Sequence, residues 1–201
     1  MTVLKYIFIA VVSYLLGALN FGIIISNRLI GSDVRKTGSG NAGATNMARA
    51  FGMKAGFLTL FSDMLKACAA MWIGSALAGD IGMMIGGIAV LVGHCYPVFY
   101  GFKGGKGISV GAAISIMLDW RVFLVIFAAF LIVAFATKKV SLGSIAASVG
   151  ITIASIAFGL SMPRIICAAV GMTIAVIRHI PNIKRVINGT EPDFKAGKEK
   201  L

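Results

Sequence analysis

The sequence predicts an all-α integral membrane protein with about seven transmembrane helices, its N-terminus outside and its C-terminus in the cytoplasm. Of the 201 residues, 58% are apolar and only 13% are charged, a balance that does not suit the surface of a water-soluble domain. The apolar residues form long runs, where helices are expected because lipid offers backbone polar groups no other partner. Most lysines and arginines lie in connections between these runs that fall on the same side of the membrane. We expect residues 1–201 to form a single polytopic domain.

Seven apolar runs define the expected spans, over residues 6–26, 55–78, 81–100, 107–118, 122–137, 142–162 and 164–180. The first run resembles a signal peptide, but it continues to about Ser26 without a small-x-small cleavage site, so a first span is expected. Asp63 and Lys66, three residues apart in the second run, are expected to pair on one helix face. The fourth run has about 12 residues and reaches only about 18 Å of a roughly 30 Å hydrocarbon core. The sequence does not decide whether this run crosses fully, tilts or re-enters.

The distribution of cations orients the spans. The chain has 19 lysines and arginines. With the N-terminus outside, 14 of them fall in the inner connections and the C-terminal tail, three fall in outer segments, and two lie within spans. This bias follows the positive-inside rule. Because these cations occupy short gaps between apolar runs, they indicate membrane topology and anion binding, and no nucleic-acid partner is expected.

No metal or cofactor site is expected. Cys68, Cys95 and Cys167 are scattered and odd in number, with no CxxC pair and no histidine at metal-ligand spacing. Carboxylates are also nearly absent from the inner connections, which argues against two-metal phosphoryl chemistry.

The first inner connection carries TGSGNAGATNMAR, residues 37–49. Its small residues allow backbone N–H groups to turn toward an anion, and its hydroxyl and amide side chains add donors. The alternative is a flexible polar linker, but a linker would not need this density of glycine, amide and hydroxyl groups. The candidate binding residues are Ser39, Gly40, Asn41, Thr45, Asn46 and Arg49.

The second inner connection reads GFKGGKG, residues 101–107, and follows GHCYPVFY. Gly104 and Gly105 permit close backbone approach, and Lys103 and Lys106 are compact cations suited to phosphate. Glycine follows the last lysine where a Walker A loop has Ser or Thr, so ATP hydrolysis is not indicated. The alternative is that the lysines only set the topology. His94, near the inner end of the preceding span, is either a hydrogen-bonded structural residue or part of the site.

The third segment, RHIPNIKRVINGTEPDF, residues 178–194, is where the last span meets the cytoplasm. His179 and Asn182 share a face if the helix continues through Pro181, and Glu191 follows on a turn. A basic tail that binds anionic lipid is the alternative. That alternative explains the lysine and arginine, but not the histidine, the asparagine or the glutamate.

On this topology all three connections lie on the inner face, each with donors or cations suited to phosphate. A soluble phosphorylated substrate and a lipid chain would meet there. A transporter or flippase for a phosphorylated small molecule is the main competing class, but it should carry polar groups through the midplane and on both faces. A structural membrane subunit would leave the three connections unexplained.

The strings GSGNAGATNMAR, GHCYPVFYGFKGGKG and RHIPNIKRVINGTE closely resemble the three signature regions of the bacterial acyl-phosphate:glycerol-3-phosphate acyltransferases, the PlsY family. The resemblance runs over nearly the whole chain. It implies transfer of a fatty acyl group from acyl phosphate to the 1-hydroxyl of sn-glycerol 3-phosphate. The products would be lysophosphatidic acid and inorganic phosphate, in the first membrane step of phospholipid synthesis. It also implies a multi-pass protein of the bacterial inner membrane, a site facing the cytoplasm, and a soluble enzyme upstream that supplies the acyl phosphate.

The resemblance further implies which residues form the site. The catalytic set would be Ser39, Lys106, His179 and Asn182. The substrate-binding set would be Gly40, Asn41, Thr45, Asn46, Arg49, His94, Lys103, Gly104, Gly105, Glu191 and either Ser141 or Ser144. The general base is expected to be either His179 or the phosphate of the donor itself.

Overall fold

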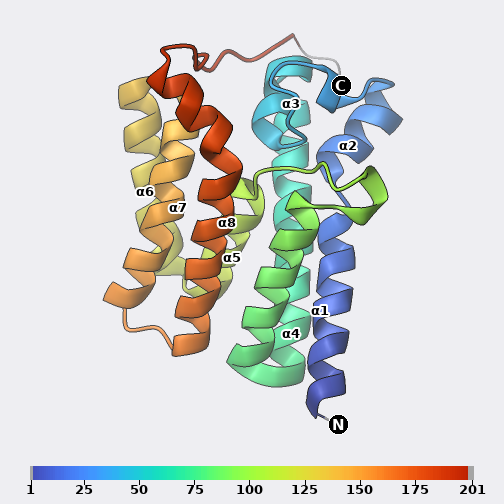
Figure 1. Cartoon of the computed structure of the whole chain (residues 1–201), viewed down its shortest axis with the longest axis vertical. Coiled ribbons are helices and arrows are strands. Elements are labelled where there is room, and N and C mark those ends of the chain that lie inside the picture. Colours follow the sequence, from blue (N-terminus) through green and yellow to red (C-terminus); the bar gives the residue numbers. More distant parts are fainter. Residues whose placement is uncertain (1, 199–201) are drawn as a thin grey trace.

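The computed structural model describes residues 2–198, and this part of the chain is helical and contains no strand. The helices are α1 (Thr2–Ala18), α2 (Phe21–Ile25), α3 (Ala44–Phe51), α4 (Met53–Cys95), α5 (Ile108–Leu118), α6 (Trp120–Thr137), α7 (Val140–Ala157) and α8 (Met162–Ile187), shown in Figure 1. A π-helical turn over Ser26–Ile30 extends α2, and short 3-10 turns occupy Val34–Lys36 and Val98–Tyr100. The all-helical prediction is confirmed.

Helix α4 is a hairpin of two antiparallel arms that meet at Ala78 and Gly79. These two residues leave the helical region, and Gly79 has a φ of +57°. The arms are in backbone contact just beyond the bend. A Cβ added to Gly82 would lie 1.9 Å from the carbonyl oxygen of Gly74, so no side chain fits between them. Counted as two segments, the arms of α4 join α1, α5, α6, α7 and α8 to make seven apolar segments within residues 2–198. That is the number predicted, with α5 shorter than the others at 11 residues.

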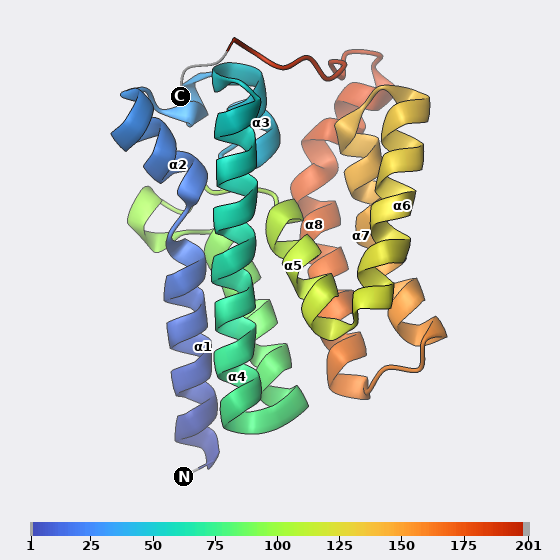
Figure 2. The same cartoon turned by 180° about the vertical axis from the view of Figure 1, so that it is seen from behind.

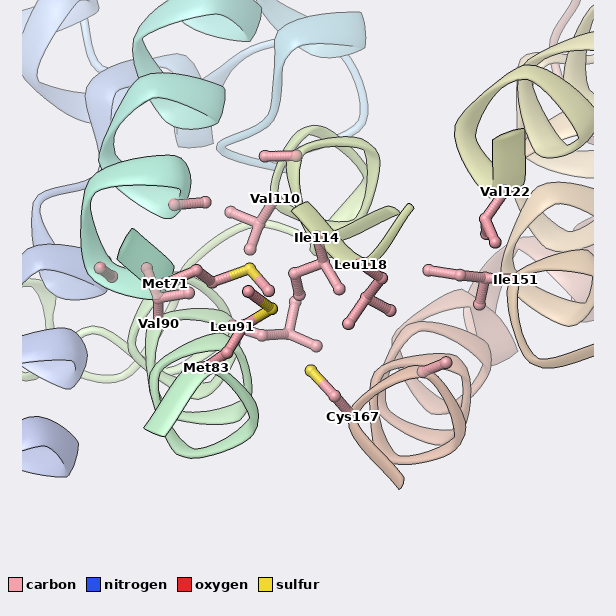
Figure 3. Close-up of a cluster of buried hydrophobic side chains, with 14 of the residues drawn as sticks. Met71, Met83, Val90, Leu91, Val110, Ile114, Leu118, Val122, Ile151 and Cys167 are labelled. Atoms are coloured by element: carbon pink, nitrogen blue, oxygen red, sulfur yellow. The ribbon is translucent and has the colours of Figure 1, made fainter. Parts of the chain in front are cut away.

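The helices form two groups with α5 between them. α1 lies along α4 on one side, and α6, α7 and α8 lie on the other, as Figures 1 and 2 show. The α1–α4 contact is close because it uses glycine: a Cβ on Gly93 would lie 2.2 Å from the carbonyl oxygen of Tyr14. Between the two groups lies a cluster of buried apolar side chains from α4, α5, α6, α7 and α8, drawn in Figure 3. It includes Met71, Val90, Leu91, Val110, Ile114, Leu118, Ile151 and Cys167.

The buried side chain of Lys66 contacts the backbone where the chain breaks between α1 and α2. The Lys66 ammonium lies 2.7 Å from Asp63 Oδ1, so the predicted pair forms. It also donates hydrogen bonds to the carbonyl oxygens of Gly17 at 3.0 Å and Leu19 at 2.7 Å. Its charge is therefore compensated by a carboxylate, and its remaining donors satisfy carbonyl groups that the end of α1 leaves without helical partners.

The polar connections gather in the same half of the molecule. The segment from residue 31 to α3, the segment 96–107, the turn at 138–139 and the tail 188–198 lie in the upper half of Figure 1, and the N-terminus, the α4 bend and the turn at 158–161 lie at the lower end. The tail crosses from α8 to α3. Its path is fixed by hydrogen bonds from Phe194 N–H to the Lys138 carbonyl and from Gly197 N–H to the Ala48 carbonyl.

Candidate active site

A cavity of about 340 Å³ lies between the two helix groups and has two chemically different parts. Apolar side chains from α4 to α8 line one part, namely Leu60, Met64, Leu91, Ile114, Phe123, Ile126, Phe127, Ile151 and Met172. Polar side chains from the three predicted connections and from α7 line the other, namely Ser39, Asn41, Thr45, Asn46, Arg49, Lys106, Ser141, Ser144, His179, Asn182 and Glu191. The cavity is thus suited to a ligand with a long apolar chain and a charged head.

The first connection is shaped by one buried amide. The two N–H groups on Asn46 Nδ2 are shared among the carbonyl oxygens of Val34, Thr37 and Asn41 at 3.1, 3.0 and 2.9 Å, and Asn46 Oδ1 accepts a hydrogen bond from Ser39 N–H at 2.9 Å. The amide therefore organises the loop around itself. The loop can wrap this tightly because Gly38 and Gly40 adopt positive φ angles of 54° and 70°. Ser39 remains exposed at the rim.

The second connection approaches its helix too closely for any side chain. Gly104 N–H and Gly105 N–H donate to the carbonyl oxygens of Cys95 and His94 at 3.2 and 3.1 Å. A Cβ on Gly104 would lie 2.1 Å from the His94 carbonyl oxygen, and one on Gly105 would lie 2.1 Å from His94 Nε2. The paired glycines thus serve contact between loop and helix, and their N–H groups are occupied by backbone carbonyls. The next residue, Lys106, turns its side chain into the cavity.

A chain of hydrogen bonds joins the second and third connections. Lys106 Nζ donates to Asn182 Oδ1 at 2.5 Å, and Asn182 Nδ2 donates to Glu191 Oε1 at 2.8 Å. Arg185 Nε donates to Glu191 Oε2 at 2.7 Å. Helix α8 continues through Pro181, as the shared face of His179 and Asn182 required, and both side chains are buried.

Burial and charge shift the ionisation of these groups. Burial lowers the pKa of Lys106 to about 8, with repulsion from Arg185 adding to the effect and the Glu191 carboxylate opposing it. Burial opposes ionisation of Glu191 as well, but the side chains of Ser141, Asn182 and Arg185 hold its pKa below the usual value. Burial also lowers the pKa of Arg49. Lys106 and Arg49 both remain charged at neutral pH, so the polar end of the cavity carries net positive charge.

The protonation of His179 follows from its geometry. Its Nδ1 lies 2.7 Å from the carbonyl oxygen of Ala175, one turn earlier on α8. A carbonyl oxygen can only accept a hydrogen bond, so Nδ1 must carry the proton. In the neutral ring Nε2 is then an acceptor on a side chain that lines the cavity.

Arg49 has spare binding capacity. Its Nε is buried and has no hydrogen-bond partner, and its only side-chain hydrogen bond that the structure records within residues 2–198 is a long one, 3.5 Å from Nη2 to the Pro192 carbonyl oxygen. The guanidinium carbon lies 5.9 Å from the centre of the Phe194 ring. A buried unpaired donor on a cation is suited to an anionic ligand.

A second cavity, of about 390 Å³, adjoins the first and is more polar in its lining. The two cavities share Ser39, Asn41 and Lys106. Lys103, Arg178 and Arg185 add three more cations to the second cavity, together with Gly40, Tyr96, Phe102, Gly104, Ile177 and Pro181. Lys106 therefore stands in the wall between the two.

The structure brings most of the predicted site residues together. Twelve of them line the first cavity, Ser141, Ser144 and His94 included, and Gly40, Lys103 and Gly104 line the second. Gly105 lines neither cavity and instead packs against the His94 ring. Among residues 2–198 no group of three His, Cys, Asp or Glu side chains is placed to hold a metal ion.

Sequence reasoning missed Arg178 and Arg185 as parts of the site. It assigned Arg178 to a span and Arg185 to a basic tail. The available signal was helical spacing, because Arg178 and Arg185 lie four residues before and three residues after Asn182 and so share its side of the helix.

Comparison with known proteins identifies the family. The family model described as glycerol-3-phosphate acyltransferase matches residues 7–189. The glycerol-3-phosphate acyltransferase of Syntrophotalea carbinolica is 39% identical over 92% of this chain and 95% of its own length, and that of Jannaschia sp. strain CCS1 is 40% identical over 94% and 92%.

Solved structures agree with this result. A crystal structure of PlsY (YgiH), an integral membrane glycerol 3-phosphate acyltransferase, in its glycerol 3-phosphate form, superposes with a TM-score of 0.90 at 35% identity, covering 94% of this chain and 96% of that one. Its lysophosphatidic acid form gives a TM-score of 0.88. This chain is therefore a member of the glycerol-3-phosphate acyltransferase family of integral membrane enzymes.

Proposed function

We propose that this protein transfers a fatty acyl group from acyl phosphate to the 1-hydroxyl of sn-glycerol 3-phosphate, releasing lysophosphatidic acid and inorganic phosphate. The observation that carries the proposal is the first cavity, which joins an apolar channel to a cationic, donor-rich end. An acyl phosphate has the same two parts. The related PlsY structures hold glycerol 3-phosphate and lysophosphatidic acid, the acceptor and the product of such a reaction.

The reaction is a direct acyl transfer. The 1-hydroxyl oxygen forms a bond to the acyl carbonyl carbon, and the bond from that carbon to the phosphate oxygen breaks. The hydroxyl proton leaves to a base, and phosphate departs with the electron pair of the broken bond. Because phosphate is a good leaving group, this route needs no covalent serine intermediate and no coenzyme. It needs cations where phosphate charge grows and donors near the carbonyl oxygen.

The two cavities supply one place for each phosphate. We assign the acyl phosphate to the first cavity, with its apolar wall, and glycerol 3-phosphate to the second, where Lys103 and Arg185 are the additional cations assigned to its phosphate. Lys106, which lines both cavities, is assigned to contact both anions. Arg49, with its unpaired buried Nε, is assigned to the donor phosphate. Holding both substrates in one orientation would provide much of the rate enhancement.

The base is either His179 or the donor phosphate. The hydrogen bond from Nδ1 to Ala175 leaves Nε2 of His179 as an acceptor, which favours the histidine. Replacement of His179 with Ala separates the two: near-normal turnover would assign the proton to the phosphate.

The sequence favours acyl phosphate over a thioester as the acyl donor. Acyltransferases that use acyl-CoA carry a His-x4-Asp box, whereas here Phe99 stands five residues after His94 and Lys184 five residues after His179. The donor would come from a soluble enzyme upstream. We propose a location in the bacterial inner membrane with the site on the cytoplasmic side, as the cation bias indicates.

Reconstitution tests the function against transport. Purified protein in liposomes is supplied with glycerol 3-phosphate and palmitoyl phosphate, and both products are followed. We expect lysophosphatidic acid and inorganic phosphate in equal amounts, dependent on glycerol 3-phosphate. Uptake into sealed vesicles without phosphate release would support the transporter in its place.

A further inference from the structure

The loop that carries Lys106 has almost no side chains with which to hold itself in place. Gly104 and Gly105 precede the lysine, both are buried, and neither has room for a Cβ. Glycine is also the residue with the most conformational freedom to lose on folding. The position of Lys106 must therefore be set by hydrogen bonds to the backbone of these two residues.

Those backbone groups are held from two sides. On one side, the N–H groups of Gly104 and Gly105 donate to carbonyls at the end of α4. On the other, Arg178 of α8 donates from Nη2 to the Gly104 carbonyl oxygen and from Nε to the Gly105 carbonyl oxygen, both at 3.2 Å. One planar guanidinium thus spans two successive peptide groups, a geometry for which its fork of donors is suited.

The arginine is itself held in place. Its guanidinium carbon lies 5.1 Å from the centre of the Tyr96 ring, and the Tyr96 carbonyl oxygen accepts a hydrogen bond from the Tyr14 hydroxyl at 2.9 Å. The stack fixes the plane of the fork. Arg178 therefore connects α8 to the end of α4 through the loop between them.

The same helix also holds the far end of the lysine. Asn182, one turn after Arg178 on α8, accepts the hydrogen bond from Lys106 Nζ. The two contacts lie four residues apart on a rigid helix, so α8 sets both the backbone position and the ammonium position of Lys106.

We infer that Arg178 is a positioning residue for the acyl transfer, acting through the backbone of Gly104 and Gly105 to place Lys106 between the two substrates. The inference rests on the proposed function. The competing role is that of a direct ligand for a substrate phosphate, because Arg178 also lines the second cavity. Against that role, Nε and Nη2 are both directed at carbonyl oxygens.

The test is a KM-against-kcat comparison of Arg178→Gln and Arg178→Lys with the wild type, using purified protein with palmitoyl phosphate and glycerol 3-phosphate. If Arg178 positions Lys106, both variants lose kcat, by roughly tenfold to a hundredfold for Gln, since a displacement of about 1 Å can cost about 10²-fold. Arg178→Lys should not restore kcat, because an ammonium group lacks the fixed fork of donors that bonds both carbonyl oxygens. KM for glycerol 3-phosphate should change less than kcat does, because Arg178 itself contacts no phosphate and Lys106 keeps its charge.

Lys184→Gln is the matched control, since it removes an exposed cation from the same helix six residues further on. It should leave both constants unchanged. Thermal unfolding in detergent checks each variant, and Arg178→Lys, which keeps the charge beside Tyr96, carries the test if Arg178→Gln does not fold.

Two results would overturn the inference. One is a large rise in KM with kcat retained and rescue by lysine, which would make Arg178 a phosphate ligand. The other is normal kinetics in both variants. Lack of turnover in the wild type is a different failure, because it would refute the acyl-phosphate reaction before Arg178 is tested.

Discussion

The ionisation of Lys106 leads to a specific pH dependence. Burial lowers its pKa from 10.5 to about 8, which corresponds to about 3 kcal/mol at about 1.36 kcal/mol for each pKa unit. If the charged ammonium is the form that binds phosphate, kcat/KM should be constant below the pKa and fall as the pH rises through it. At pH of about 9 only about one-tenth of the free enzyme keeps the charge, so kcat/KM should be about tenfold below its plateau.

The Lys106→Arg variant tests whether loss of the ammonium charge causes this fall in kcat/KM. A guanidinium stays charged throughout the range, so the variant should lose the alkaline limb up to a pH of about 9.5, even though its different shape lowers the rate. The assay follows inorganic phosphate from palmitoyl phosphate with and without enzyme at each pH, so that spontaneous hydrolysis can be subtracted. A wild-type profile that stays flat through this range would refute the reasoning. So would a Lys106→Arg profile with the same limb as the wild type.

Three further predictions concern single side chains. Lys66→Met leaves the buried carboxylate three residues earlier uncompensated and should lower the free energy of unfolding in detergent by about 3–5 kcal/mol; an unchanged denaturation midpoint would contradict this. Gly105→Ala places a methyl group against the His94 imidazole and should reduce kcat at least about tenfold. Gly150→Ala, where a Cβ meets only Ile126 Cγ2 at an ordinary 3.5 Å, should be near neutral; equal effects would count against the packing argument. Ser141 is buried beside Glu191 and helps to lower the pKa of that carboxyl, whereas Ser144 Oγ donates to a carbonyl one turn earlier, so Ser141→Ala should lower the rate more than Ser144→Ala; the reverse order in kcat/KM would reject that assignment.

The spans were predictable from the sequence because lipid imposes helices on every long apolar run. The gathering of the three polar connections in one half of the molecule followed from the same argument, since alternate crossings return to the same side. The sharp reversal within α4 was also visible as a gap between two apolar runs. These features depend on local composition and on chain order alone.

Other parts of the site could not be predicted, because their partners lie far away in the chain. Gly104 and Gly105 of the second connection were expected to permit close backbone approach and to belong to the substrate-binding set; in the structure the backbone they approach is the end of α4, whose carbonyls accept their N–H groups. Arg178 contacts a carbonyl 73 residues earlier. Helical spacing places Arg178 on the same side of its helix as Asn182, but it does not show which atoms the guanidinium contacts, and only the packing of α8 against the loop reveals its role.

Asn46 shows a similar limit. Its amide was expected to serve the ligand together with the neighbouring hydroxyls and amides. In the structure it forms four hydrogen bonds to its own loop, to residues between five and 12 positions away. A loop rich in donors must satisfy its own buried carbonyls before it can bind an anion, and the sequence does not show which donors are used in this way.

The identity of the acyl donor is the most direct test of the whole account. Purified protein in lipid is given glycerol 3-phosphate with equal concentrations of palmitoyl phosphate, palmitoyl-CoA or palmitoyl acyl carrier protein, and the formation of lysophosphatidic acid is measured. We predict product from the acyl phosphate alone, with one phosphate released for each ester formed. Equal turnover from the thioesters, or none from the acyl phosphate, would contradict it.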